Sequence, residues 1–189
     1  MSEIQTRNRA KITSGIREMT KIALFTAMLS VMSQISVPLP GGVPVSLQTF
    51  AVCLCGYFLG KKSGVISILV YIALGICGVP VFSGFSGGIQ RMLGGTGGFI
   101  VGFIFLALFC AFGIRSGNKK TNAAIAILFG CAGIAVCHLL GVLWFAHVTG
   151  NSLFSSFLAA SAGFIVKDIL SCAVAYMIYC AAQKSIKLK

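Results

Sequence analysis

The sequence predicts an all-α integral membrane protein with six transmembrane helices, both termini in the cytoplasm and irregular loops on the outer side. Three observations predict this class. Of the 189 residues, 57% are hydrophobic and only 10% are charged, which is more apolar than a soluble domain of this size. The apolar residues fall into six runs. Most basic residues lie in alternate connections between those runs.

The six apolar runs are each taken as one helix, since a spanning helix needs roughly 20 apolar residues and fewer where neighbours surround it. They are Met19–Ser36, Pro44–Gly60, Gly64–Val79, Thr96–Ile114, Asn122–Trp144 and Phe157–Ala182. We therefore expect a cytoplasmic segment over residues 1–18, a membrane domain over 19–182 and a cytoplasmic tail over 183–189. The loop after the short third helix is expected to dip back into the protein.

The basic residues fix the predicted orientation. Thirteen cations fall on one side of a six-span chain, and the positive-inside rule makes that side the cytoplasm. They are Arg7, Arg9, Lys11, Arg17, Lys21, Lys61, Lys62, Arg115, Lys119, Lys120, Lys184, Lys187 and Lys189. We attribute the net charge of +12 to contact with the anionic headgroups of the lipid bilayer, and we expect no nucleic-acid partner.

The outer side is almost free of charge. It holds two cations, Arg91 and Lys167, and one acid, Asp168. Ionisable groups at membrane depth are costly and usually face the protein interior or a water-filled cavity, so these three are candidates to line one pocket. The alternative for Lys167 and Asp168 is an ion pair that pins a loop to the last helix. All four prolines (Pro38, Pro40, Pro44 and Pro80) also lie on this side, where they favour irregular backbone.

A glycine-rich stretch, Val81–Phe99, carries Arg91 and contains seven glycines. Glycine lets backbone N–H groups approach a ligand closely, so we predict that this stretch lines a binding site. Its chemistry suits a small ligand with one carboxylate, an apolar body and a few neutral polar atoms. We expect Gln48 and Thr49 to lie about one turn into the second helix on the same side. Three aromatic side chains are candidates to pack on the ligand body: Phe82, Phe85 and Phe99.

No catalytic or nucleotide-binding arrangement is apparent. The sequence contains no nucleophile–base pair and only three acids, two of them at the N-terminus, so we expect no catalytic residues. The stretch Gly56–Ser63, GYFLGKKS, resembles a phosphate loop. It is one residue short between its glycines, and a second lysine stands where Ser or Thr would bind Mg²⁺. We therefore expect no ATP site, no cofactor and no ATPase activity in this chain.

The small residues inside the helices have packing explanations. Gly56-x-x-x-Gly60 and Gly98-x-x-x-Gly102 are predicted to be positions of close helix contact. The eight cysteines lie in apolar runs without a CxxC motif and are interpreted as small hydrophobes. His138 is interpreted as a packed or hydrogen-bonded residue, with no metal site. The cysteines are Cys53, Cys55, Cys77, Cys110, Cys131, Cys137, Cys172 and Cys180.

Together these stretches carry a resemblance to a known family. The sequence contains PLPGGVPVSLQTFAV, then LGKKSGVISILVYIALGICGVPVFSGFSGG, then LGGTGGFIVGF, in this order and spacing. Over essentially its whole length the chain resembles the biotin-specific substrate-binding (S) components of energy-coupling-factor transporters, the BioY family. Asp168 matches the acid of the family's last-helix pattern. Ser171 stands where many members have lysine, and the lysine here is Lys167.

The resemblance implies a prokaryotic plasma-membrane subunit that captures biotin from outside. It implies partners: a transmembrane coupling subunit and two ATP-binding subunits that hydrolyse ATP. It also implies that Ala23 and Ala27, a small-residue pair on the first helix, contact the coupling subunit. In the implied pocket Asp168 accepts from the ureido N–H groups, and either Arg91 or Lys167 meets the carboxylate. The remaining residues expected to bind substrate are Gln48, Thr49, Phe82, Ser83, Gly84, Phe85 and Gly88.

Two other functions stay open on sequence grounds. A stand-alone secondary transporter for a small organic anion would take up its substrate without an ATPase, although few intramembrane acids are available for proton coupling. A small membrane enzyme or assembly factor using Lys167 and Asp168 would release a product or bind a protein client.

Overall fold

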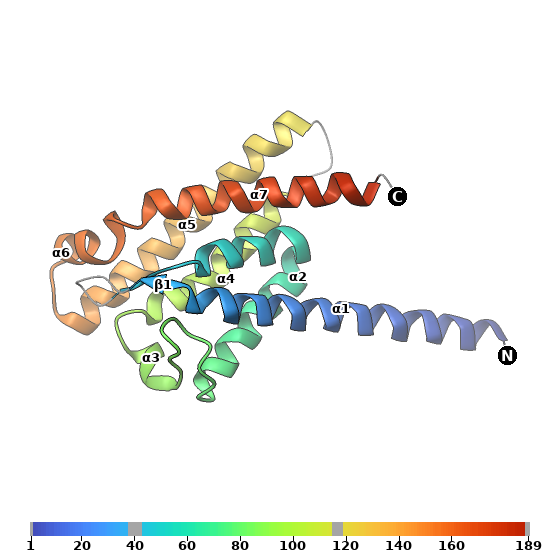
Figure 1. Cartoon of the computed structure of the whole chain (residues 1–189), viewed down its shortest axis with the longest axis horizontal. Coiled ribbons are helices and arrows are strands. Elements are labelled where there is room, and N and C mark those ends of the chain that lie inside the picture. Colours follow the sequence, from blue (N-terminus) through green and yellow to red (C-terminus); the bar gives the residue numbers. More distant parts are fainter. Residues whose placement is uncertain (1, 38–42, 115–118, 188–189) are drawn as a thin grey trace.

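The computed structural model describes residues 2–37, 43–114 and 119–187, which are mostly helical (Figure 1). The predicted all-α class is confirmed. Pro38, Pro40, Arg115 and Lys189 lie outside the described residues. The elements are α1 (Ser2–Gln34), β1 (Ser36–Val37), β2 (Val45–Ser46), α2 (Gln48–Ile76), α3 (Ile89–Leu93), α4 (Gly97–Phe112), α5 (Lys119–Thr149), α6 (Leu153–Phe157), the π-helical turn η1 (Leu158–Ala162) and α7 (Ile165–Lys187).

Within the described residues, three helical stretches have the length and apolar composition to cross a membrane, if α2 is counted as one stretch although its backbone turns at Gly60. They are α2, the Ala123–Thr149 part of α5 and the Ile165–Ser185 part of α7. Two shorter apolar helical stretches, Gly97–Phe112 and Leu153–Ala162, accompany them. The chain thus has membrane-spanning helices, while the count of six spans stays a prediction.

The helix α2 is a hairpin of two legs that meet at Gly60. The backbone of Gly60 has φ 73° and ψ −170°, a conformation that L side chains rarely adopt. The legs lie side by side, because Gln48 Nε2 donates to the Tyr71 hydroxyl oxygen at 2.7 Å and Cys55 Sγ lies 4.0 Å from Ser67 Oγ. The second and third predicted helices are therefore present as these two legs.

Several predicted boundaries were wrong. The first helix begins at Ser2 and extends through the predicted N-terminal segment, because no proline interrupts the chain before Met19. The second begins at Gln48 and not at Pro44, because Val45 and Ser46 pair with β1 in a two-stranded antiparallel sheet.

The predicted last helix is interrupted. Over 157–182 the chain passes from α6 through η1 to α7, which begins at Ile165. Asp168 consequently lies in the first turn of α7, where the positive end of the helix dipole favours an acid.

Close packing of α4 on α5 depends on glycine. A Cβ at Gly98 would lie 2.4 Å from the carbonyl oxygen of Leu140, and one at Gly102 would lie 2.8 Å from Cys137 Cα. The packing role predicted for this pair is confirmed. For the other pair, the prediction holds for Gly56, whose Cβ would lie 2.4 Å from the Ala107 carbonyl oxygen. It was wrong for Gly60, which meets no atom within 4 Å and forms the turn of α2.

We expect Gly98→Ala to lower the melting temperature of the purified protein in detergent. The new methyl group collides with backbone of α5 rather than with a movable side chain, and overpacking of this kind costs about 1–3 kcal/mol. Gly163→Ala is the matched control, since a Cβ there meets nothing within 4 Å. Equal melting temperatures for the two variants would contradict the close α4–α5 contact.

The two ends of the molecule differ (Figure 1). The start of α1, the start of α5 and the end of α7 lie at one end, and β1, α3 and α6 lie at the other. The end with β1, α3 and α6 carries the irregular backbone, including the segment 77–96 between α2 and α4. This irregular end holds the cavity described next.

Candidate functional site

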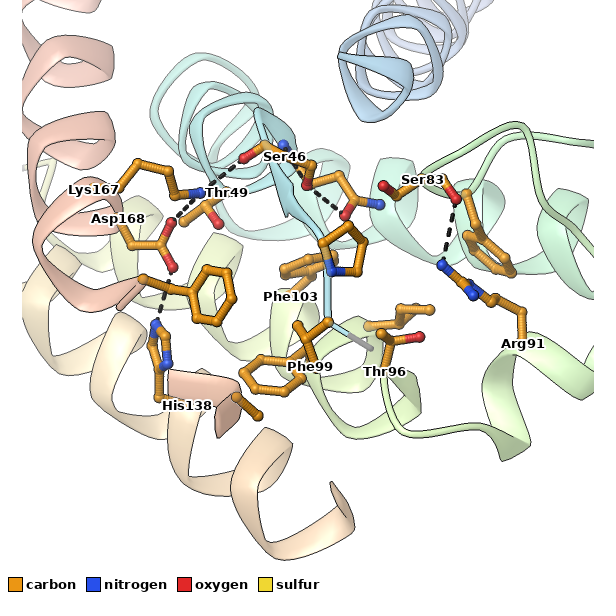
Figure 2. Close-up of a pocket in the computed structure, with 17 residues that line it drawn as sticks. Ser46, Thr49, Ser83, Arg91, Thr96, Phe99, Phe103, His138, Lys167 and Asp168 are labelled. Carbon is orange, nitrogen blue, oxygen red and sulfur yellow. Dashed lines mark hydrogen bonds and ion pairs between the residues drawn. The ribbon is translucent and has the colours of Figure 1, made fainter. Parts of the chain in front are cut away.

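A cavity lies at the irregular end of the helices and is closed by residues from both halves of the chain (Figure 2). Its free volume is about 60 Å³. The lining residues combine an apolar wall with charged and polar groups at two ends. They are Val43, Pro44, Ser46, Gln48, Thr49, Phe82, Ser83, Arg91, Thr96, Phe99, Ile100, Phe103, His138, Ala160, Phe164, Lys167 and Asp168.

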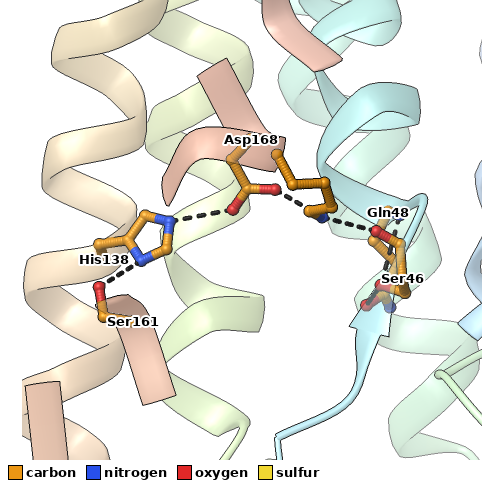
Figure 3. A network of polar contacts seen from close by, with 6 residues as sticks. Ser46, Gln48, His138, Ser161 and Asp168 are labelled. Atoms are coloured by element: carbon orange, nitrogen blue, oxygen red, sulfur yellow. Dashed lines mark hydrogen bonds and ion pairs between the residues drawn. The ribbon is translucent and has the colours of Figure 1, made fainter. Parts of the chain in front are cut away.

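One end of the cavity is built around Asp168 (Figure 3). One carboxylate oxygen, Oδ2, lies 2.9 Å from His138 Nε2, and the other, Oδ1, lies 2.5 Å from Lys167 Nζ. His138 Nδ1 is 2.7 Å from the hydroxyl oxygen of Ser161, which fixes the imidazole ring from its far side. Asp168 is only 6% exposed, so these two partners compensate a charge that would otherwise be costly to bury.

The same polar chain continues across the cavity to α2. Lys167 Nζ donates to the backbone carbonyl oxygen of Ser46 at 2.7 Å. The hydroxyl of Ser46 donates to Gln48 Oε1 at 2.8 Å, and Gln48 Nε2 donates to the Tyr71 hydroxyl. This run of contacts joins α7, β2 and both legs of α2, so it holds the acid, the lysine and the glutamine in fixed relative positions.

The opposite end of the cavity is formed by Arg91 and Ser83 (Figure 2). Arg91, from α3, has one long contact, from Nη2 to the Ser83 carbonyl oxygen at 3.5 Å, and retains further donors. The hydroxyl of Ser83 is buried and has no hydrogen-bond partner among the described residues. A buried hydroxyl without a partner is unfavourable, and a ligand atom in the cavity would satisfy it.

The segment that carries Ser83 and Arg91 is held on α2 by Phe82. The Phe82 ring is fully buried beside Tyr71, with ring centroids 5.4 Å apart. It fits there because residue 75 is glycine: a Cβ on Gly75 would lie 2.0 Å from the Phe82 ring. The Gly88 amide also donates to the Gly75 carbonyl oxygen at 2.7 Å, immediately before α3. These contacts place Arg91 over the cavity.

Seven of the ten predicted substrate-binding residues line the cavity, and three do not. Gly84 and Phe85 form the tip of a turn with φ of 74° and 52°, between paired Phe82 and Ser86. This turn points Phe85 away from the cavity, with 74% of its surface exposed, and its amide donates to Gln34 Oε1 at 2.7 Å. Gly88 also lies outside the lining.

The sequence-based prediction missed several lining residues. His138 was expected to be packed or hydrogen-bonded, and it is hydrogen-bonded, but its contact with Asp168 was not foreseen. A polar residue inside an apolar run was the signal that could have placed it at the site. Ser46, Thr96, Phe103 and Phe164 were also missed. Phe103 and Phe164 are spaced like ordinary core residues, and nothing in the sequence distinguishes them.

The electrostatics of the cavity favour a monoanion. Two cations, Arg91 and Lys167, face one carboxylate, Asp168, so these three groups together carry one uncompensated positive charge. Lys167 is already paired with Asp168 and with the Ser46 carbonyl, so Arg91 is the cation with free donors. A guanidinium can bind a carboxylate through two parallel hydrogen bonds.

Comparison with known proteins identifies the family. The model of the BioY family matches residues 5–188, nearly the whole chain. The chain belongs to the BioY family. Among BioY relatives, the probable biotin transporter BioY of Pyrococcus horikoshii is 43% identical over 162 residues, covering 86% of this chain and 93% of that protein. The biotin transporter BioY of Thermotoga maritima is 42% identical over 127 residues, covering 67% and 73%.

A solved structure extends the BioY resemblance to three dimensions. The crystal structure of the S-component for biotin from an ECF-type ABC transporter matches with a TM-score of 0.80 and 25% identity. The match covers 91% of this chain and 93% of that chain.

Proposed function

We propose that this BioY-family chain is the biotin-binding S component of an energy-coupling-factor transporter. It captures biotin from outside and delivers it inward together with a transmembrane coupling subunit and two ATP-binding subunits, which hydrolyse ATP. The observation that carries the proposal is the cavity between Arg91 and Asp168. It has one net positive charge, an aromatic wall and polar groups at both ends, in a chain whose fold matches the S-component for biotin.

The polar groups at the two ends of the cavity favour one orientation of bound biotin. Its carboxylate pairs with Arg91 and accepts from the Ser83 hydroxyl, since both have unused donors. Its ureido N–H groups donate to Asp168 at the other end, where His138 and Lys167 hold the acid in place. The apolar rings and chain of the ligand contact Phe99, Phe103 and Phe164, and Gln48 and Thr49 complete the polar contacts.

Binding requires the cavity to expand. Pockets that enclose a small organic ligand usually measure roughly 300–1,000 Å³, several times the free volume of about 60 Å³ here. The segment 77–96 is the part that moves outward, because it connects α2 to α4 and contains only the single short helix α3, and it carries Arg91 and Ser83. Gly84 and Gly88, both at positive φ, supply the backbone freedom for that motion. They contribute to binding by allowing the segment to move and not by lining the cavity.

The remaining assignments follow from the same proposal. The chain is a multi-pass protein of a prokaryotic plasma membrane, with six spans, residues 1–18 and 183–189 in the cytoplasm and the cavity facing outward. Ala23 and Ala27 are exposed on α1. Small exposed residues let a second helix approach closely in lipid, so this face contacts the coupling subunit.

We expect the purified chain in detergent to bind labelled biotin tightly, in a one-to-one ratio and without ATP. The measurement is equilibrium binding, beside uptake by cells that express this chain with and without a coupling subunit and ATP-binding subunits. Uptake by the chain alone, driven by an ion gradient, would overturn the proposal in favour of a secondary transporter for organic anions. Absence of binding by a protein that melts cooperatively would overturn the choice of biotin.

A further inference from the structure

Three cysteines converge in the packed interior, outside the lining of the ligand cavity. Cys53 on α2, Cys110 on α4 and Cys172 on α7 have their Sγ atoms within 4.8 Å of one another. Their exposed fractions are 0%, 0% and 1%, and all three are free thiols. Cys53 and Cys172 lie one helical turn from Thr49 and Asp168, so this trithiol cluster sits just beyond the cavity.

The position of the Cys172 sulfur is fixed by its neighbours. Cys172 Sγ lies 3.1 Å from the Tyr57 hydroxyl oxygen, which in turn lies 3.3 Å from the Ala126 carbonyl oxygen. Residue 130 on α5 is glycine, and a Cβ there would lie 2.2 Å from Cys172 Sγ. Gly130 therefore leaves the space that this sulfur occupies. Close packing of α2, α4, α5 and α7 therefore holds the three thiols together in the interior.

Three sulfur atoms at this spacing form a donor set for one soft ion. Soft thiolate ligands select thiophilic ions. A sulfur–metal bond of about 2.3 Å places three sulfurs around one centre about 4 Å apart, within the observed limit. The charge of the complex then decides between ions. Three thiolates around a monovalent or divalent ion leave two or one negative charges in an apolar core, which is costly, whereas a trivalent centre leaves none.

We propose that the trithiol cluster binds one trivalent thiophilic metalloid per chain, with arsenite as the representative ligand. Arsenous acid is uncharged at neutral pH, so it enters the interior without the cost of desolvating an ion. In the reaction, As(OH)3 and three thiols give As(SR)3 and three water molecules. Each arsenic–oxygen bond is replaced by an arsenic–sulfur bond, each thiol proton leaves with a hydroxide as water, and no atom is oxidised or reduced.

The test measures arsenic retained by the reduced, full-length protein in detergent. The protein is incubated with sodium arsenite, passed through a desalting column and analysed for arsenic per chain. We expect one arsenic per chain for the wild type, and at least a tenfold loss for Cys53→Ala, Cys110→Ala and Cys172→Ala. Cys55→Ala is the matched control, because Cys55 lies on the same helix, is equally buried and has its sulfur outside the cluster; it should retain the full amount.

Two results would overturn the proposal: no arsenic retained by the wild type, or equal retention by Cys53→Ala and Cys55→Ala. Because core variants can fail to fold, X-ray absorption on the arsenite-treated wild type gives an independent test. Three sulfur neighbours around arsenic support the trithiol site, whereas one or two sulfurs with remaining oxygen neighbours contradict it. None of these measurements uses biotin, so their failure leaves the proposed transport function untouched.

Discussion

Asp168→Asn is expected to weaken biotin binding about 100-fold. The substitution keeps the shape of the side chain but removes the charge that His138 and Lys167 compensate, and it replaces one acceptor oxygen by a donor. Hydrogen bonds to a charged group contribute about 1.5–3 kcal/mol, and a 100-fold change in affinity corresponds to about 2.7 kcal/mol. The measurement is equilibrium binding of labelled biotin in detergent.

The controls for Asp168→Asn distinguish a direct effect on ligand binding from a loss of folding. Glu18→Gln makes the same acid-to-amide change on α1, where Glu18 accepts from the Ser63 hydroxyl, and should leave the affinity unchanged. His138→Gln should weaken binding by a smaller factor of about 10, because it removes one support of the acid and leaves its charge. If Asp168→Asn bound biotin with wild-type affinity, the proposed role of this acid in binding would be wrong. A lowered melting temperature would point to loss of the fold instead.

Arg91→Ala is expected to weaken binding of biotin at least 100-fold and to leave binding of biotin amide nearly unchanged. The amide lacks the negative charge that Arg91 pairs with in the proposed orientation, so removal of the guanidinium has little to change for that ligand. Titrating both ligands against wild type and variant gives the interaction energy of the arginine with the carboxylate.

The companion variant is Lys167→Ala. Because Lys167 is bound to Asp168 and to the Ser46 carbonyl, its loss should lower the affinity for biotin and the affinity for biotin amide by a similar factor. The opposite pattern, with Lys167→Ala affecting only biotin and Arg91→Ala affecting both ligands equally, would exchange the roles of the two cations. Arg17→Ala, near the middle of α1 and outside the cavity lining, is the charge-matched control and should change neither affinity.

The helical class was predictable because hydropathy is a property of each residue and its neighbours in sequence. The contrast between Gly56 and Gly60 marks the limit of that approach. Both belong to one small-residue pattern, yet Gly56 packs on α4 and Gly60 turns the chain. A glycine packs against a neighbour when its face of the helix meets another helix, and it forms a turn when its φ is positive. The residue type predicts neither outcome, since glycine permits both.

The candidate site divides in a similar way. Arg91, Lys167 and Asp168 could be selected from sequence because a charge at membrane depth needs a reason. The contact of Lys167 with Ser46 could not, because it uses a backbone carbonyl that every residue possesses. Phe82 and Phe85 were equivalent as aromatic candidates. The turn between them sends one ring into the core and the other to the surface, which only its positive φ values reveal.

Because the cavity carries an uncompensated positive charge, the empty and the ligand-bound protein also differ in the free energy of moving this end of the molecule into the bilayer. Without a ligand, the Arg91 end carries a cation that favours contact with water or headgroups. A bound monoanion cancels it. Any step that brings this end of the molecule deeper into the hydrocarbon therefore costs less free energy for the loaded form than for the empty form. Occupancy can in this way select which molecules proceed, without any change in the shape of the helices.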